Sequence, residues 1–243
     1  MFAVIFVVQP KKDRFDDYLS LAKSLKPDLE KIDGFIDNER FGSKRADGRV
    51  LSLSTWRDEK AVIRWRTLGI HHEVQEKGRY EVFEDYHLRV GEIVADNEIP
   101  RGQKLHELRF DETEIGDAKV VTISEWSPTK GEKQASADLV ADLGLPKSGT
   151  ESVIDQEVFE SIYSPGKLLL LVSWRDGAAA EHWKPRTVAG GKLRHRNVRV
   201  IRDYGMFDRR EAPQFYPEVK TTVQKKASSG ESVGDLTVLV FLA

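Results

Sequence analysis

The 243-residue sequence contains no cysteine. This single absence excludes disulfides, thiolate nucleophiles, iron–sulfur clusters and cysteine-ligated zinc. It also suits a reducing compartment, so we expect the protein to be cytoplasmic.

The sequence also has neither an excess of charge of one sign nor a long hydrophobic run. Lys and Arg number 38 against 40 Asp and Glu, which gives no electrostatic reason to expect nucleic acid or an anionic membrane as a partner. The apolar run at the N-terminus stops at Pro10 and is too short to cross a bilayer. It predicts a buried strand. The basic segment 192–204 is interpreted as a solvated strand edge, with an anion site as the alternative.

The common catalytic and phosphate-binding motifs are also missing. The sequence has no P-loop, no Gly-x-Gly-x-x-Gly after a strand, no His-Glu-x-x-His and no Gly-x-Ser-x-Gly. The contiguous His-His-Glu at 71–73 would point three ways around a helix, so it does not have the spacing of metal ligands. We therefore expect no metal site.

The chain does contain an internal repeat. Displacing the sequence by 118 residues places "TWRDEKAVIRW" (55–65) on "SWRDGAAAEHW" (173–183). Two of the five tryptophans, Trp56 and Trp65, then fall on two others, Trp174 and Trp183. Such a match is improbable by chance, and it indicates a duplicated unit.

Each copy of the repeat carries the same order of structural signals. The pattern predicts a strand, a helix, a hairpin, a second helix and a last strand, which is the β-α-β-β-α-β order of ferredoxin-like folds. In the second helix of each copy, Asp58 and Asp176 are placed to favour the N-terminus. The predicted ranges are strand 2–9, helix 13–32, strands 35–43, 49–56 and 80–94 in the first copy, then strand 118–126, helix 132–145 and strands 153–163, 167–174 and 194–207 in the second.

Two of the predicted strands, at 3–8 and 168–172, are apolar at every position rather than at alternate ones. Continuous apolar strands indicate a sheet that is buried on both faces. We therefore predict an α+β protein in which the two ferredoxin-like repeats pack sheet to sheet, as an intrachain dimeric α/β barrel. The predicted division is residues 1–94 for the first repeat, 95–117 for a linker, 118–210 for the second repeat and 211–243 for a C-terminal tail.

The first copy resembles a known family. The residues that carry the resemblance are Trp56-Arg57-Asp58, Trp65, His71, Gln75, Gly78-Arg79 and "DYHLRV" at 85–90. They are similar to the pattern of the antibiotic biosynthesis monooxygenase (ABM) family, whose members are usually homodimeric α/β barrels of short chains. The resemblance implies one of two activities: oxygenation of polyaromatic substrates with O₂ and no cofactor, or binding and degradation of haem.

The resemblance also suggests the residues of a site. His71 and Trp65 would be catalytic, with His71 handling a proton or ligating haem, and Asn38 and Tyr86 would contact the substrate. For each the ordinary alternative stays open: a histidine packed against the neighbouring strand, a core tryptophan, and polar strand residues with satisfied hydrogen bonds. His72 should face solvent, one residue around the helix from His71.

Arg79 should form a salt bridge with Asp85 or Glu84 rather than contact a substrate. Ala189 in the second copy falls at the position of His71. We therefore expect one cavity in the first repeat, with the second repeat supplying the opposing sheet.

The function that we predict is cofactor-independent monooxygenation of an aromatic or polyketide-like small molecule. The alternatives are a haem-binding or haem-degrading protein, and a non-catalytic scaffold that binds a hydrophobic small ligand. Beyond the intrachain pseudo-dimer, further homo-oligomerisation stays open.

Overall fold

The computed structural model describes residues 1–129, 138–145 and 152–213. The first half contains β1 (Phe2–Pro10), α1 (Phe15–Leu29), β2 (Phe35–Ser43), β3 (Val50–Trp56), α2 (Glu59–Arg66), α3 (Gly69–Lys77), the π-helical turn η1 (Gly78–Val82) and β4 (Phe83–Asp96). The second half contains β5 (Val120–Pro128), α4 (Leu139–Asp142), β6 (Val153–Ser161), β7 (Leu168–Trp174), α5 (Gly177–His182) and β8 (Gly191–Gly205). Both halves have the predicted order of elements.

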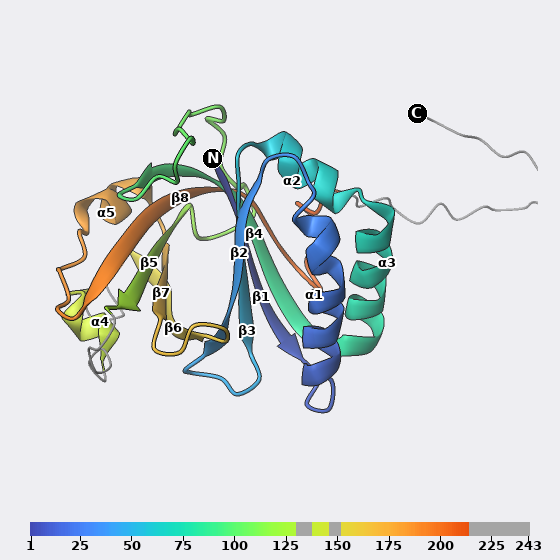
Figure 1. The fold of residues 1–243 in the computed structure, drawn as a ribbon. Coiled ribbons are helices and arrows are strands. Elements are labelled where there is room, and N and C mark those ends of the chain that lie inside the picture. The colour runs from blue at the N-terminus through green and yellow to red at the C-terminus, as the bar shows by residue number, and fades with distance from the viewer. Residues whose placement is uncertain (130–137, 146–151, 214–243) are drawn as a thin grey trace, which may run out of the picture.

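The strands form one closed barrel in the order β1-β3-β2-β6-β7-β5-β8-β4. Each half contributes four adjacent strands, and the halves join where β2 pairs with β6 and where β4 pairs with β8. Helices α1, α2 and α3 lie together on one side of the barrel, and α4 and α5 lie on the opposite side (Figure 1). The α+β fold with two ferredoxin-like halves is as predicted, and the two sheets are continuous at both edges.

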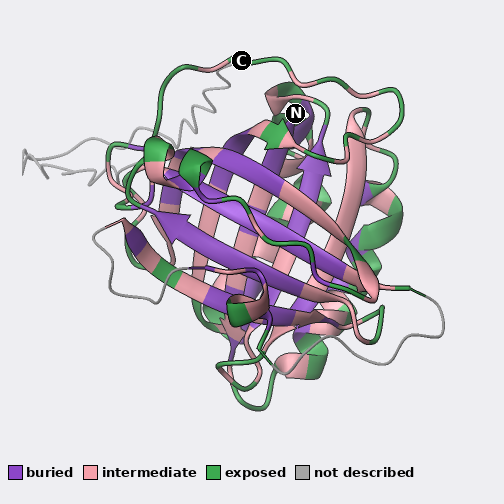
Figure 2. Ribbon diagram, turned by 90° about the vertical axis from the view of Figure 1, so that its left-hand side faces the viewer, coloured by how far each residue is buried: buried purple, intermediate pink, exposed green. Residues whose placement is uncertain are grey.

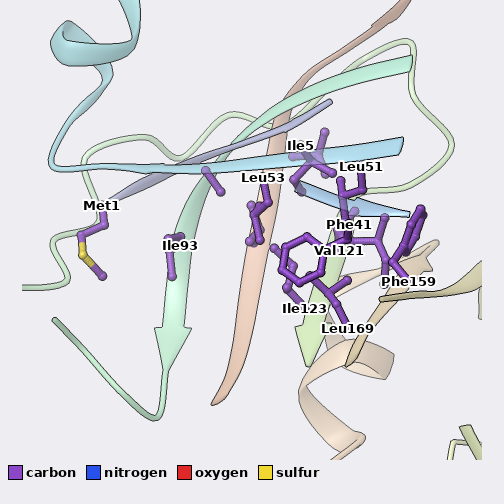
Figure 3. Packing of buried hydrophobic residues seen from close by; sticks show 14 residues of the cluster. Met1, Ile5, Phe41, Leu51, Leu53, Ile93, Val121, Ile123, Phe159 and Leu169 are labelled. Atoms are coloured by element: carbon purple, nitrogen blue, oxygen red, sulfur yellow. The ribbon is translucent and has the colours of Figure 1, made fainter. Parts of the chain in front are cut away.

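The barrel interior explains the strands that are apolar at every position. Its core takes residues from both halves, among them Ile5, Phe41, Ile123 and Phe159, whose side chains meet inside the barrel (Figure 3). The opposite faces of the same strands are buried beneath the helices in separate clusters. The strands are consequently buried over much of their length, whereas exposed residues are concentrated on the helices and loops (Figure 2).

The junction between β2 and β6 shows two-fold symmetry at the offset of 118 residues. Phe41 pairs with Ser161, and Ser43 pairs with Phe159. The Ser43 hydroxyl donates to the Glu157 carboxylate at 2.5 Å, and the Ser161 hydroxyl donates to the Glu39 carboxylate at 2.6 Å. The residues that align in the repeat therefore make reciprocal contacts, as the two copies do in a symmetric dimer.

The helix ends follow the local sequence signals. The side chains of Asp58 and Asp176 accept hydrogen bonds from the backbone N–H groups of Ala61 and Ala179, at 2.8 and 2.7 Å. These are the predicted N-caps of α2 and α5. Pro27 lies two residues before the last residue of α1, where it removes one N–H from the hydrogen bonds of the last turn. Part of the helix predicted at 132–145, and the tail from residue 214, lie outside the described residues.

The interpretation of 192–204 as a solvated strand edge is wrong. Strand β8 is paired on both sides, by β4 and β5. Its Arg196 is only 1% exposed and forms an ion pair with Glu125 inside the barrel. Arg194 and Arg199 likewise pair with Asp96 and Glu92. The basic residues were misinterpreted because their acidic partners lie on other strands.

No helix in the described ranges is long and apolar enough to cross a membrane.

Candidate functional site

A cavity of about 550 Å³ lies between the outer face of the first-half strands and helices α1, α2 and α3. All four residues of the predicted site, His71, Trp65, Asn38 and Tyr86, contribute to its lining. They come from α3, α2, β2 and β4, so it is the packing of the helices on the sheet that brings them together.

Two cross-strand rows of side chains form the floor of this cavity. Their centre, on β1 and β4, is apolar. One side, on β2 and β3, is polar, and the other side, on β8, carries an arginine and a tyrosine. The first row is Asn38, Ser54, Val4, Val90 and Arg202, and the second is Arg40, Ser52, Phe6, Leu88 and Tyr204.

His71 and Trp65 form a stacked pair in the helical wall. Their ring centroids are 4.0 Å apart with an interplanar angle of 19°. His71 Nδ1 lies 3.0 Å from the backbone carbonyl oxygen of Trp65. A carbonyl only accepts hydrogen bonds, so this contact assigns the proton to Nδ1 and leaves a lone pair on Nε2.

Burial lowers the pKa of His71 to about 4, because removing the ring from water disfavours the imidazolium form. The hydrogen bond to the Trp65 carbonyl opposes this effect without cancelling it. At neutral pH the ring is therefore uncharged. Nε2 makes no hydrogen bond with the described part of the chain, and it is available as a proton acceptor or as a ligand atom.

The side-chain amide nitrogen of Asn38 is not free to donate a hydrogen bond to a substrate. Its amide nitrogen donates to the Ser52 hydroxyl at 3.1 Å and to the Leu53 carbonyl at 3.0 Å. Both amide hydrogens are thereby used within the protein, and only the amide oxygen remains for a ligand. Ser52 also lines the cavity, and its own hydrogen is not used in any hydrogen bond with a described residue. Ser52 is thus the better donor, and no pattern in the sequence indicated it.

Tyr86 lies on the β8 side of the cavity. Its hydroxyl oxygen accepts a hydrogen bond from Arg209, a residue that follows β8. The neighbouring Tyr204 contacts the same arginine, whose guanidinium carbon is 5.8 Å from the Tyr204 ring centroid. Burial raises the pKa of Tyr204 to about 12, so its phenol stays protonated at neutral pH.

Two neighbouring predictions have different outcomes. His72 faces solvent as predicted, with its Nε2 3.8 Å from a carboxylate oxygen of Glu76. The predicted salt bridge of Arg79 is wrong: among the described ion pairs none joins Arg79 to Asp85 or Glu84. Arg79 instead donates to the Met206 carbonyl at 3.3 Å, because η1 directs it toward the residues after β8.

The prediction that the second repeat supplies only the opposing sheet is incomplete. Arg202 and Tyr204 on β8, together with Arg209 and Pro213, also line the first-half cavity. The sequence analysis did not assign Arg202, Arg209 and Pro213 to the site, because β8 reaches the site only through its pairing with β4. The basic character of 192–204 was a signal for Arg202 alone.

Comparison with known proteins agrees with the resemblance. The family model described as "Antibiotic biosynthesis monooxygenase" matches residues 1–77. A jasmonate monooxygenase ABM from Pyricularia oryzae is 44% identical over 222 residues, which is 89% of this chain and 99% of the relative.

Solved structures match at lower identity. An anthrone oxidase-like protein is 10% identical with a TM-score of 0.33, covering 87% of this chain and 95% of its own. A protein from Shewanella oneidensis is 18% identical with a TM-score of 0.35, covering 37% of this chain and 86% of its own. Scores this low carry no argument about function.

Proposed function

The chain belongs to the antibiotic biosynthesis monooxygenase family, and on this premise we propose that it oxygenates a hydrophobic small molecule in the first-half cavity without a cofactor. The observation that carries the proposal is the His71–Trp65 pair. It combines a flat aromatic surface with a neutral imidazole whose Nε2 is unbonded. An aromatic ligand stacks favourably on such a surface.

The chemistry requires a substrate with an acidic CH₂ group beside a carbonyl. His71 Nε2 removes one proton, the resulting carbanion gives its electrons to O₂, and the product takes the proton back as a hydroperoxide. Loss of the second C–H proton with cleavage of the O–O bond then releases water. The CH₂ becomes a carbonyl, one oxygen atom of O₂ is retained and the other leaves as water, so the substrate supplies all four electrons.

The low pKa of His71 limits the substrates on which it can act. A base with a pKa of about 4 transfers protons effectively only from acidic carbon. Aromatic and polyketide-like phenols of the anthrone type offer such carbon. Jasmonate, named in the relative from Pyricularia oryzae, also has a CH₂ beside its ring ketone, and a bound anion near His71 would raise the basicity of the imidazole.

Exchange of His71 for alanine tests the proposal, with His182→Ala on α5, outside the cavity lining, as the control. Oxygen consumption is measured with anthrone and with jasmonic acid, in the presence of a chelator. We expect kcat/KM to fall by roughly 10²–10⁴-fold in His71→Ala, the range for a lost proton-transfer group, and to stay within about twofold in His182→Ala. Full activity of His71→Ala with an intact fold by circular dichroism would refute the role of His71.

Haem is the second candidate, because the same neutral imidazole nitrogen suits an axial ligand. The donor set fits: His71 would hold the iron, and cavity arginines such as Arg66 and Arg202 would hold the propionates. Bound haem would supply redox chemistry at iron. Titration with haemin separates the candidates, since a Soret shift that disappears in His71→Ala supports haem, and no shift supports the cofactor-free reaction.

A further inference from the structure

We infer that Arg66, Arg202 and Arg209 form a carboxylate-binding site at the β8 end of the cavity, so that its ligand is an amphipathic organic acid. The ligand is a substrate only if the proposed function holds, whereas the binding site stands on its own geometry.

The three arginines converge on one side chain, Tyr204. Arg202 lies two residues before it on the same strand, and Arg209 packs over its ring. Arg66 approaches from the last residue of α2 on the opposite wall. The positive charges of all three favour the ionised form of the Tyr204 phenol, against the effect of burial. All three arginines thus line the same end of one cavity, around the Tyr204 side chain.

None of the three arginines forms an ion pair with a carboxylate in the described part of the chain, although Arg202 acts electrostatically on Asp111, whose main partner is Arg109. The Arg209 side chain donates to the Tyr86 hydroxyl and lies over the Tyr204 ring, and the buried Nε of Arg66 has no hydrogen-bond partner. The cavity lining contains two carboxylates, Glu59 and Glu76. Of these, Glu59 is bound by Arg109 at 2.6 Å. The β8 end of the cavity therefore has an excess of positive charge.

The arginines of β8 differ in whether they have an acidic partner. Arg194, Arg196 and Arg199 are each paired with a carboxylate of the barrel, whereas Arg202, which faces the cavity, is not. Partly buried guanidinium groups without an anion are energetically unfavourable, and a ligand carboxylate removes this cost by accepting two parallel N–H hydrogen bonds.

The rest of the cavity determines which other groups the acid should have besides its carboxylate. Next to the arginines the floor is apolar, with Val90 and Leu88 on β4 and Val4 and Phe6 on β1. A carboxylate at the β8 end thus places an apolar body over β4 and β1, and brings its far end toward the hydroxyl of Ser52. A molecule with a carboxylate, a hydrophobic middle and a distant carbonyl matches all three regions.

Calorimetric binding of acids and their methyl esters tests this inference in the full chain. The probes are jasmonic acid and 2-naphthoic acid, each compared with its methyl ester under conditions without turnover. We expect each acid to bind at least about tenfold more tightly than its ester, the effect of one or more charge-assisted hydrogen bonds. In Arg66→Gln and Arg202→Gln the preference should fall to threefold or less.

Arg64→Gln is the matched control. Arg64 lies on the same helix but outside the cavity lining, and donates to the Asp33 carbonyl at 2.8 Å. Its loss changes the net charge equally and should leave the preference for the acid intact. Three results would overturn the inference. They are equal affinity of acid and ester in the wild type, binding of neither acid, and an undiminished preference for the acid in both folded cavity variants. His71→Ala should keep the preference for the acid over its ester. A failure of the oxygenase proposal is therefore distinguishable from a failure of the carboxylate-binding site.

Discussion

Thr55 and Ser173 lie 118 residues apart, and each accepts a hydrogen bond from an arginine of the opposite half. Arg196 on β8 donates to the Thr55 hydroxyl at 3.2 Å, and Arg89 on β4 donates to the Ser173 hydroxyl at 3.0 Å. Each hydroxyl residue stands one position before the tryptophan of its Trp-Arg-Asp sequence. Polar contacts thus cross the barrel in both directions and tie the halves together from within.

Substitution of Glu125 by glutamine should destabilise the protein strongly. Arg196 is almost completely buried and pairs with Glu125, so the variant leaves a buried guanidinium without its anion. The expected loss is about 3–5 kcal/mol in the free energy of unfolding, measured by urea denaturation.

The control for this experiment is Asp33→Asn, which removes an exposed ion pair with Arg57 and should cost less than about 1 kcal/mol. A double variant, Glu125→Leu with Arg196→Met, should regain much of the stability, because Lys167, the other partner of Glu125, keeps its ion pair with Glu39. Similar stability of Glu125→Gln and Asp33→Asn would contradict the importance of the buried pair.

Two buried histidines should make the free energy of unfolding fall as the pH is lowered from 6.5 to 4. Burial lowers the pKa values of both His71 and His195 to about 4. In that pH range the unfolded chain binds protons that the folded chain does not, so the full contribution is present above pH 6.5 and is lost as the pH falls toward 4. At pH 5 the expected loss is about 2 kcal/mol per histidine.

Urea unfolding at pH 7.5 and pH 5.0 measures this loss. In His195→Gln the difference between the two pH values should shrink by roughly half of the histidine contribution. An identical difference in the wild type and His195→Gln would show that His195 is not held neutral by the fold.

The two N-caps provide a comparison between the halves. Asp58→Ala and Asp176→Ala each remove a hydrogen bond to the first turn of a helix, at a cost of about 1 kcal/mol. Of these two helices only α2 carries lining residues of the cavity, among them Trp65 and Arg66. Asp58→Ala should therefore also weaken binding of 2-naphthoic acid, measured by calorimetry, and equal binding by the two variants would argue against control of the cavity by α2.

Much of the secondary structure was predictable from the sequence, because the repeated Trp-Arg-Asp at 56–58 and 174–176 positions each hairpin and each second helix. The start of β4 was predicted three residues early, since residues 78–82 form the turn η1. The barrel itself was predicted, but the strand pairings that close it were not. The pairings of β2 with β6 and of β4 with β8 depend on registers between segments far apart in the chain.

The same limit applies to the site. His71 and Trp65 could be placed in one wall because they are six residues apart in a helical region. Whether the hydrogens of Asn38 are free, or which groups surround Arg202, depends on neighbouring strands. Sequence patterns report periodicity within one segment, whereas the cationic end of the cavity combines residues of α2 with residues of β8 and the segment after it.

The contribution of β8 to the cavity has a consequence for divergence between the halves. In an assembly of two identical chains, any substitution changes both sites together. In a single chain the two halves change independently, and substitutions at Arg202, Tyr204 or Arg209 alter the cavity of the other half. The later half of the chain can thereby change the properties of a chamber that it borders but does not enclose.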